Sequence, residues 1–110
     1  MARGRASQTS AAVTTALDLL GRRWALRVVW ELREAPLRAT ELQGRCDQMS
    51  LSVLYQRLRD LADAGLLTQD ADGAYALTRY GAELGEALGP VDPWSKRWAR
   101  SQAARSRVGR

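Results

Sequence analysis

Three polar side chains near the middle of the chain could hydrogen-bond to DNA bases, and we call them the reading edge: Ser52, Gln56 and Arg59. The same stretch also carries a leucine stripe at helical spacing, formed by Leu54, Leu58 and Leu61. Leu51 is expected to extend this stripe. In an α-helix the two sets lie on opposite faces, so the leucines would pack inward and the polar groups would face outward. Arg can bind guanine O6 and N7, Gln can bind adenine N6 and N7, and Ser can bind a base or a phosphate.

The helix that carries the reading edge has clear ends. Ser50 can cap its first turn by accepting a backbone N–H. Gly65 is expected to end it in a left-handed conformation, with Leu66 folded back on Leu61. The N-terminal half would then lie nearest the bases, which adds Ser50 and Val53 to the candidate contacts.

Two helices are predicted before the reading helix. Apolar residues repeat at i, i+3, i+4 and i+7 from Val13, which predicts a first helix over residues 10–20. Residues 24–32 are apolar nearly all round and predict a buried second helix that Pro36 closes. Trp24 and Trp30 are therefore expected in the core.

A third, short helix and a hairpin flank the reading helix. The capping-box spacing from Thr40 to Gln43 predicts a helix that runs to about Cys46. Asp72 and Gly73 lie between two short β-capable segments and predict a hairpin. A last helix capped by Thr78 should bend or break near Gly89, where Pro90 and Pro93 follow.

This order of elements predicts a mainly α fold with a small β-hairpin wing, a winged helix-turn-helix. We expect a domain over residues 10–102, between disordered basic tails at 1–9 and 103–110. Such a fold does not settle the function, because winged domains also bind proteins. The alternative is a winged-helix protein–protein interaction module that binds a partner through its acidic middle, without specific DNA binding.

Charge and composition narrow the function classes. The net charge is +5 over 110 residues, but the surplus lies at the ends, and residues 28–93 carry six Arg against eleven acids. Histidine is absent and there is one cysteine, so no His base, catalytic triad or zinc site is expected, and no cofactor. With no membrane-length apolar run and no disulfide pair, we predict a non-enzymatic cytoplasmic protein.

Three stretches resemble HxlR-type winged helix-turn-helix regulators, relatives of the MarR group: ALDLLGRRW (16–24), VLYQRLRDLADAGLL (53–67) and YALTRYGAEL (75–84). The resemblance covers roughly residues 11–98, with the elements in the family's order. It implies a homodimeric bacterial transcription factor that acts on double-stranded DNA. It also implies that the first and last helices form the dimer interface, and that paired recognition helices bind a roughly palindromic operator.

The resemblance also implies roles for individual residues. The recognition-helix region corresponds to Ser52, Val53, Gln56, Arg57 and Arg59. Arg38 matches a basic residue at the start of the first helix of the helix-turn-helix. We expect Arg57 and Arg38 to contact phosphates, with Arg79 as a third candidate near the wing.

Apolar residues outside the predicted core indicate the dimer interface: Val13, Leu17, Leu20, Leu88, Trp94 and Trp98. A further hypothesis is a small aromatic effector between the Trp-bearing helices and the DNA-binding core. The chain departs from the family in three places, one of them being Pro90 and Pro93, which are expected to reshape the dimerising helix. Ala11 stands where many members carry a sensing Cys, and the wing tip bears Asp70 and Asp72 in place of Arg or Lys.

Overall fold

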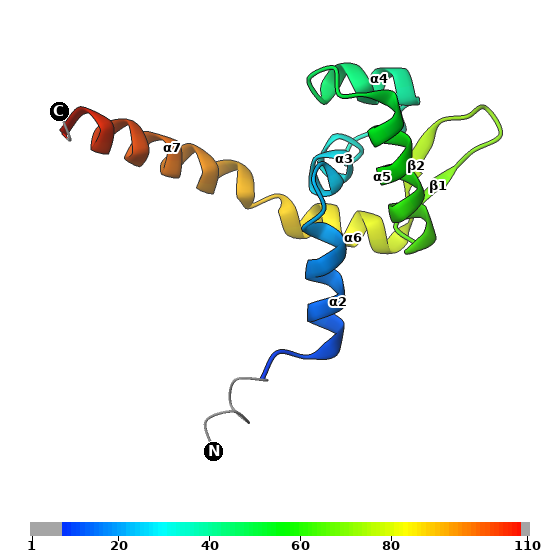
Figure 1. The fold of residues 1–110 in the computed structure, drawn as a ribbon, viewed down its shortest axis with the longest axis horizontal. Coiled ribbons are helices and arrows are strands. Elements are labelled where there is room, and N and C mark those ends of the chain that lie inside the picture. Colours follow the sequence, from blue (N-terminus) through cyan, green and yellow to red (C-terminus); the bar gives the residue numbers. More distant parts are fainter. Residues whose placement is uncertain (1–7, 109–110) are drawn as a thin grey trace.

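The structure, a computed structural model, describes residues 8–108 of the chain. The elements follow one another in the order α2 (Ala11–Leu20), α3 (Ala25–Glu31), α4 (Ala39–Arg45), α5 (Leu51–Asp63), β1 (Leu67–Gln69), β2 (Tyr75–Leu77), α6 (Arg79–Leu88) and α7 (Val91–Val108) (Figure 1). The predicted mainly α fold with a small β-hairpin is confirmed. Most of the predicted N-terminal tail, residues 1–7 of 1–9, lies outside the described residues.

α3 is the central helix of the domain. α2, α4, α5 and α6 all pack against it, and its Ala25, Val28 and Val29 are fully buried. The predicted buried helix is thus confirmed on one side, whereas Leu26 is 38% exposed. Trp24 is half-buried and packs against the core as predicted, but the half-buried Trp30 is not among the side chains that pack there. The remaining core side chains come from the segments around it: Leu32, Leu37, Leu42, Cys46, Met49, Leu54, Leu58, Leu61 and Leu67.

α4, a tight turn and α5 form the helix-turn-helix. The N-cap of α4 is Arg38, whose backbone N–H donates to the Glu41 carboxylate at 2.8 Å. The predicted helix that starts close to Thr40 is confirmed, since α4 begins at Ala39, but its capping box uses Glu41 and not Gln43. The Gln43 side-chain amide donates instead to the Met49 carbonyl at 2.9 Å and spans the turn.

Both ends of α5 form as predicted. The Ser50 hydroxyl accepts the Val53 backbone N–H at 3.2 Å. Gly65 has a φ of 78°, and the Leu66 N–H donates to the Leu61 carbonyl at 2.9 Å. This is the bond that closes a Schellman motif, in which a left-handed residue turns the chain back on the helix.

The wing is an antiparallel hairpin of β1 and β2 with Leu67 opposite Leu77. One carboxylate oxygen of Asp70 accepts the backbone N–H groups of Asp72 and Ala74, at 2.9 and 3.0 Å. Asp70 therefore shapes the turn, which explains an acid at the tip.

A backbone connection that the sequence did not predict ties the wing to the helix-turn-helix. Leu37 pairs with Tyr75 through two antiparallel bonds, Leu37 N–H to Tyr75 carbonyl at 3.0 Å and the reverse at 2.8 Å. Because Leu37 directly precedes the N-cap of α4, the wing and the start of α4 hold each other in place.

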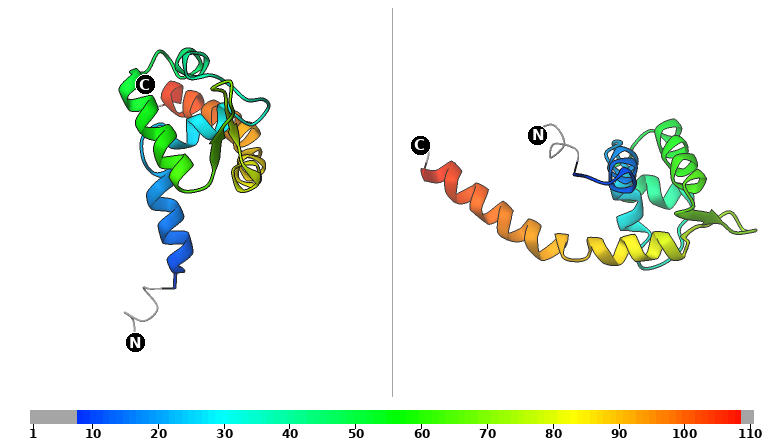
Figure 2. Two further views of the ribbon diagram at one scale, coloured as in Figure 1. Left: turned by 90° about the vertical axis from the view of Figure 1, so that its right-hand side faces the viewer. Right: turned by 90° about the horizontal axis from the view of Figure 1, so that it is seen from below.

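The C-terminal segment is two helices, as the prolines predict. The Thr78 hydroxyl caps α6 by accepting the Gly81 N–H at 3.2 Å, and the chain breaks at Gly89–Pro90 before α7. α7 then runs away from the body of the domain (Figure 2). The predicted disordered tail at 103–110 is wrong over 103–108, where α7 continues; 109–110 lie outside the described residues.

Gly81 allows α6 to lie against the carbonyl of Leu66. A Cβ at Gly81 would be 2.1 Å from that oxygen, so Gly81→Ala is expected to lower the free energy of unfolding by about 1–3 kcal/mol. Gly44→Ala in α4 is the control, because its Cβ meets nothing closer than 3.8 Å; Ala there should stabilise by roughly 0.5–1 kcal/mol. Urea unfolding of both variants tests this, and equal stabilities would contradict it.

Candidate nucleic-acid interface

α5 turns the reading edge to the surface. Its leucine stripe is fully buried, with exposures of 0–1%, whereas Ser52, Gln56 and Arg59 are all exposed. The predicted two-faced helix is therefore confirmed. Leu51 is 40% exposed, so its predicted place in the stripe is wrong. The first turn of α5, with Ser52 and Val53 also exposed, has little of the domain to pack against.

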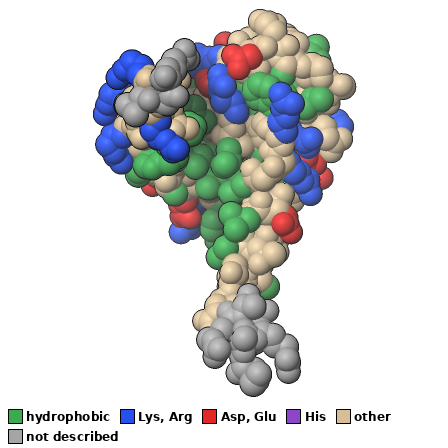
Figure 3. Space-filling view, turned by 60° about the vertical axis from the view of Figure 1, so that its left-hand side comes forward, with side chains coloured by type: hydrophobic (Ala, Val, Ile, Leu, Met, Phe, Trp, Pro, Cys, Tyr) green, Lys and Arg blue, Asp and Glu red, His purple; other side chains and the backbone are tan. Residues whose placement is uncertain are grey.

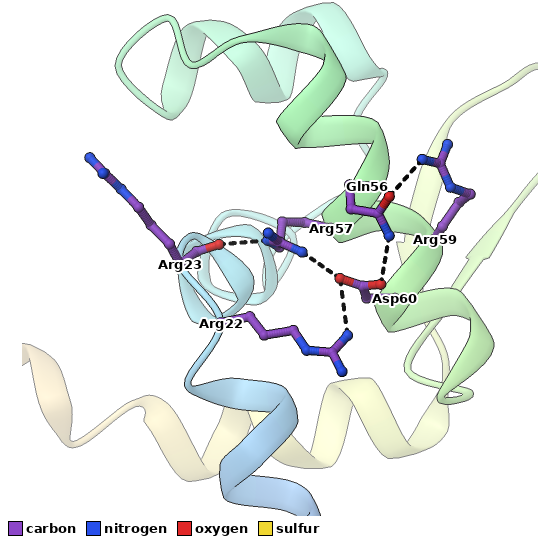
Figure 4. A network of polar contacts seen from close by, with 6 residues as sticks. All are labelled: Arg22, Arg23, Gln56, Arg57, Arg59 and Asp60. Atoms are coloured by element: carbon purple, nitrogen blue, oxygen red, sulfur yellow. Dashed lines mark hydrogen bonds and ion pairs between the residues drawn. The ribbon is translucent and has the colours of Figure 1, made fainter.

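Two members of the reading edge belong to a hydrogen-bond network centred on Asp60 (Figure 4). The Gln56 amide nitrogen donates to Asp60 at 3.0 Å, and an Arg59 guanidinium nitrogen donates to the Gln56 oxygen at 3.0 Å. On the other side, Arg22 from the segment after α2 pairs with the Asp60 carboxylate at 3.2 Å. The sequence reasoning missed Asp60, although its position four residues after Gln56 predicts contact along one helix face.

Arg57 does not share the outward direction of Arg59. Its guanidinium pairs with Asp60 at 2.5 Å and donates to the Arg23 backbone carbonyl at 2.8 Å (Figure 4). The side chain is only 20% exposed. Arg57 therefore fastens α5 to the α2–α3 connection, where Trp24 has a φ of 77°, and its contact with phosphate stays a prediction.

The network keeps Asp60 ionised. The hydrogen bond from Gln56, then those from Arg57 and Arg22, lower the pKa of Asp60 below its ordinary value, against the opposing effect of burial. A lowered pKa stabilises the fold above the ordinary Asp range, near pH 3.9, and that stabilisation is lost as pH falls through the lower folded value. At neutral pH the carboxylate is therefore an acceptor only.

The two other predicted phosphate contacts lie apart from the reading edge. Arg38 is exposed at the start of α4, and its guanidinium lies beside Gly73 of the wing, 3.3 Å from where a Cβ would stand. Arg79 begins α6 with its side chain 83% exposed and pairs loosely with Glu83 at 3.4 Å. Both cations are at the surface.

Cys46 is a core residue at the end of α4. It is fully buried, and desolvation raises the pKa of its thiol. A buried thiol with a raised pKa has little reactive thiolate. Packing is therefore sufficient to explain Cys46.

Hydrophobic side chains also gather on a surface between α2 and α7 (Figure 3). Val13 and Leu17 on α2 are 47% and 61% exposed, and Trp94 and Trp98 on α7 are each 52% exposed. The two Trp rings stack on each other, with centroids 5.8 Å apart. The other two predicted interface residues, Leu20 and Leu88, are half-buried. We call these six residues the apolar face.

A groove of about 490 Å³ lies between α3, α6 and the start of α7. Trp30 and Leu88 form part of its walls, together with Val91. The Arg33 guanidinium covers the Trp30 ring at 3.7 Å. The groove is mainly apolar, and a half-buried tryptophan lines it.

Comparison with known proteins identifies the family. The family model described as HxlR-like helix-turn-helix matches residues 19–103, which is most of the chain. The chain belongs to the HxlR-like helix-turn-helix family. This HxlR-like chain is 29% identical over 89 residues, 76% of its length, to the uncharacterized HTH-type transcriptional regulator YvaP of Bacillus subtilis (strain 168), covering 82% of that protein.

Two solved structures share the fold of this HxlR-like chain. Quinone-bound YodB from B. subtilis superposes with a TM-score of 0.72 at 24% identity, covering 81% of this chain and 99% of YodB. A transcriptional regulator of the MarR family from Enterococcus faecalis V583 superposes with a TM-score of 0.70 at 26% identity, covering 89% and 96%. The chain is thus a DNA-binding transcriptional regulator of the helix-turn-helix type.

Membrane-spanning helices and metal-binding clusters are both absent from residues 8–108. None of the helices there is both long enough and apolar enough to cross a membrane. No group of three or more acidic or cysteine side chains in that range could hold a metal ion.

Proposed function

We propose that the protein is a homodimer that binds a roughly palindromic operator by its sequence, with α5 as the recognition helix. One observation carries this proposal: α5 buries its leucine stripe and leaves the reading edge at the surface. With 13 residues at about 1.5 Å each, α5 is roughly 20 Å long, a length that suits a major groove ~12 Å wide.

Roles follow from the chemistry of each side chain. Gln56, Arg59 and Ser52 would contact bases, with Ser50 and Val53 beside them at the start of α5. Arg38 and Arg79 would contact phosphates, because each is exposed near the wing.

The proposed dimer rests on the apolar face. A small domain rarely leaves this much contiguous apolar surface, including two stacked tryptophans, open to water. A helix such as α7, which runs away from its own body, can pack on a second copy. Twofold symmetry would then place two copies of α5 about one DNA turn apart, ~34 Å, in successive major grooves.

An effector pocket is a second proposal, favoured by the groove beside Trp30. The neighbour YodB was solved with quinone bound. We infer that the groove between α3, α6 and α7 takes a small planar ring molecule, aromatic or quinonoid, since its walls are mainly apolar.

The reading edge is tested through Arg59. Arg59→Ala should lose about 1–3 kcal/mol of discrimination at the base pair it contacts, because the bidentate bond to guanine is gone. Arg79→Ala is the contrast: loss of a phosphate contact should weaken binding to all sequences alike. Selection of DNA from a random pool by each purified variant gives its base preference, and titration with the selected DNA gives its affinity.

An Arg59→Ala selection identical to that of the unmodified protein would remove Arg59 from base contact. Absence of any sequence preference in the unmodified protein would favour the protein–protein interaction module instead.

The dimer is tested by Leu17→Glu. A carboxylate in the middle of the apolar face would be buried without a partner, so this variant should sediment as a monomer at concentrations where the unmodified protein is a dimer. Leu51→Glu is the matched control, since Leu51 is exposed on α5 away from that face. A Leu17→Glu protein that stays dimeric would refute this interface.

The effector pocket is tested by tryptophan fluorescence. Titration with a benzoquinone should give a saturable change that Trp30→Phe removes, because Trp30 lines the groove. Trp24→Phe is the control, since Trp24 is not among the groove's lining residues. Saturation that persists in Trp30→Phe would place the ligand elsewhere, and absence of saturation would refute the pocket.

A further inference from the structure

One carboxylate on the next turn of α5, that of Asp60, supports the reading edge. Asp60 lies one turn after Gln56 on α5, and its side chain is only 11% exposed. One of its oxygens accepts the Gln56 amide, and the other meets the guanidinium groups of Arg57 and Arg22. Both oxygens of Asp60 therefore have hydrogen-bonding or ionic partners within this chain.

The chemistry of its neighbours leaves the Gln56 amide one orientation. An ionised carboxylate only accepts hydrogen bonds, and a guanidinium only donates them. Gln56 lies between the two, with Asp60 at 3.0 Å on one side and Arg59 at 3.0 Å on the other. Its NH₂ must therefore face Asp60 and its oxygen must face Arg59, because the flipped amide would put acceptor against acceptor and donor against donor.

The Asp60 carboxylate is also held in place by the segment between α2 and α3. Arg57 connects Asp60 to the Arg23 carbonyl, and Arg22 adds an ion pair at 3.2 Å. Arg22 and the Arg23 carbonyl belong to the α2–α3 connection, so Asp60 is held by a second segment and not by α5 alone (Figure 4). A group held in this way can determine where the next side chain points.

We propose that Asp60 is a specificity-determining positioning residue, which orients the Gln56 amide and, through it, the Arg59 guanidinium for base contact. This inference rests on the proposed function, in which Gln56 and Arg59 contact bases. The Gln56 NH₂ keeps one free N–H, and the Gln56 oxygen keeps one free lone pair. One donor and one acceptor are what bidentate binding to adenine N7 and N6 requires. Fixing both side chains before binding also lowers the entropy lost on binding.

Asp60→Asn keeps the size of the side chain at position 60 but replaces one hydrogen-bond acceptor with a donor, so it tests the orientation of the Gln56 amide. The Asn oxygen would turn toward Arg22 and Arg57, so its NH₂ would face Gln56 and flip that amide. Arg59 would then meet an NH₂ group and lose its acceptor. We expect DNA selected from a random pool to show about tenfold less discrimination at the base pairs contacted by Gln56 and Arg59. Preferences elsewhere in the operator should be unchanged, which a general loss of structure would not produce.

Two further variants complete the experiment. Asp63→Asn removes the same charge three residues along α5, where the carboxylate is exposed and has no ion pair within residues 8–108; it should keep the full preference. In a Gln56→Ala background, adding Asp60→Asn should change base preference no further, because Asp60 acts through Gln56.

The results distinguish failure of the Asp60 proposal from failure of the proposed sequence-specific DNA binding. A random-pool selection with no preference in the unmodified protein would overturn both. A clear preference in the unmodified protein that Asp60→Asn reproduces would overturn the role of Asp60 alone, as would an additional change in the Gln56→Ala background.

A measurement on the unmodified protein covers the case in which Asp60→Asn does not fold. The side-chain NH₂ of Gln56 should exchange its protons with water more slowly than that of Gln48, because it donates to Asp60. Gln48 is exposed, and its side-chain amide makes no hydrogen bond within the described residues. Equal exchange rates, measured by NMR, would overturn the proposal.

Discussion

The burial of three leucines on one face of α5 determines what the rest of the structure can do. Leu54, Leu58 and Leu61 pack against α3 and β1. Because an α-helix has 3.6 residues per turn, Gln56 and Arg59 then lie on the outward face. The other elements maintain that arrangement. The tight turn after α4 sets the angle at which α5 enters, and the Schellman motif at Gly65 sends the chain directly into the wing.

Local chemistry carried most of the sequence prediction. The caps at Ser50 and Thr78, the left-handed Gly65 and the break before Pro90 each depend on residues within five positions, and the structure has all of them. Such signals are visible in a single sequence because both partners lie in the same short window. The two faces of α5 could be predicted for the same reason, from the period of its leucines.

Contacts between segments far apart in the sequence could not be predicted from the sequence alone. Arg57 is at an outward-looking position by period, but its partner is the Arg23 carbonyl, 34 residues earlier. The Leu37–Tyr75 bridge and the covered Asp60 likewise depend on segments that meet only in the folded chain. α7 extends over residues 103–108 although its polar sequence lacks apolar periodicity, because good helix formers such as Ala and Arg continue it.

The pairing of charges decides which cation of α5 is available to DNA. Arg57 is neutralised by Asp60 at close range, and Arg22 shares that carboxylate. Arg59 instead bonds to the neutral amide of Gln56, and no acid pairs with it among residues 8–108. Its charge is therefore uncompensated locally, although the middle of the chain is acidic as a whole. Within α5, Asp60 therefore offsets the charge of Arg57, and Arg59 is left as the exposed guanidinium without an acidic partner in that range.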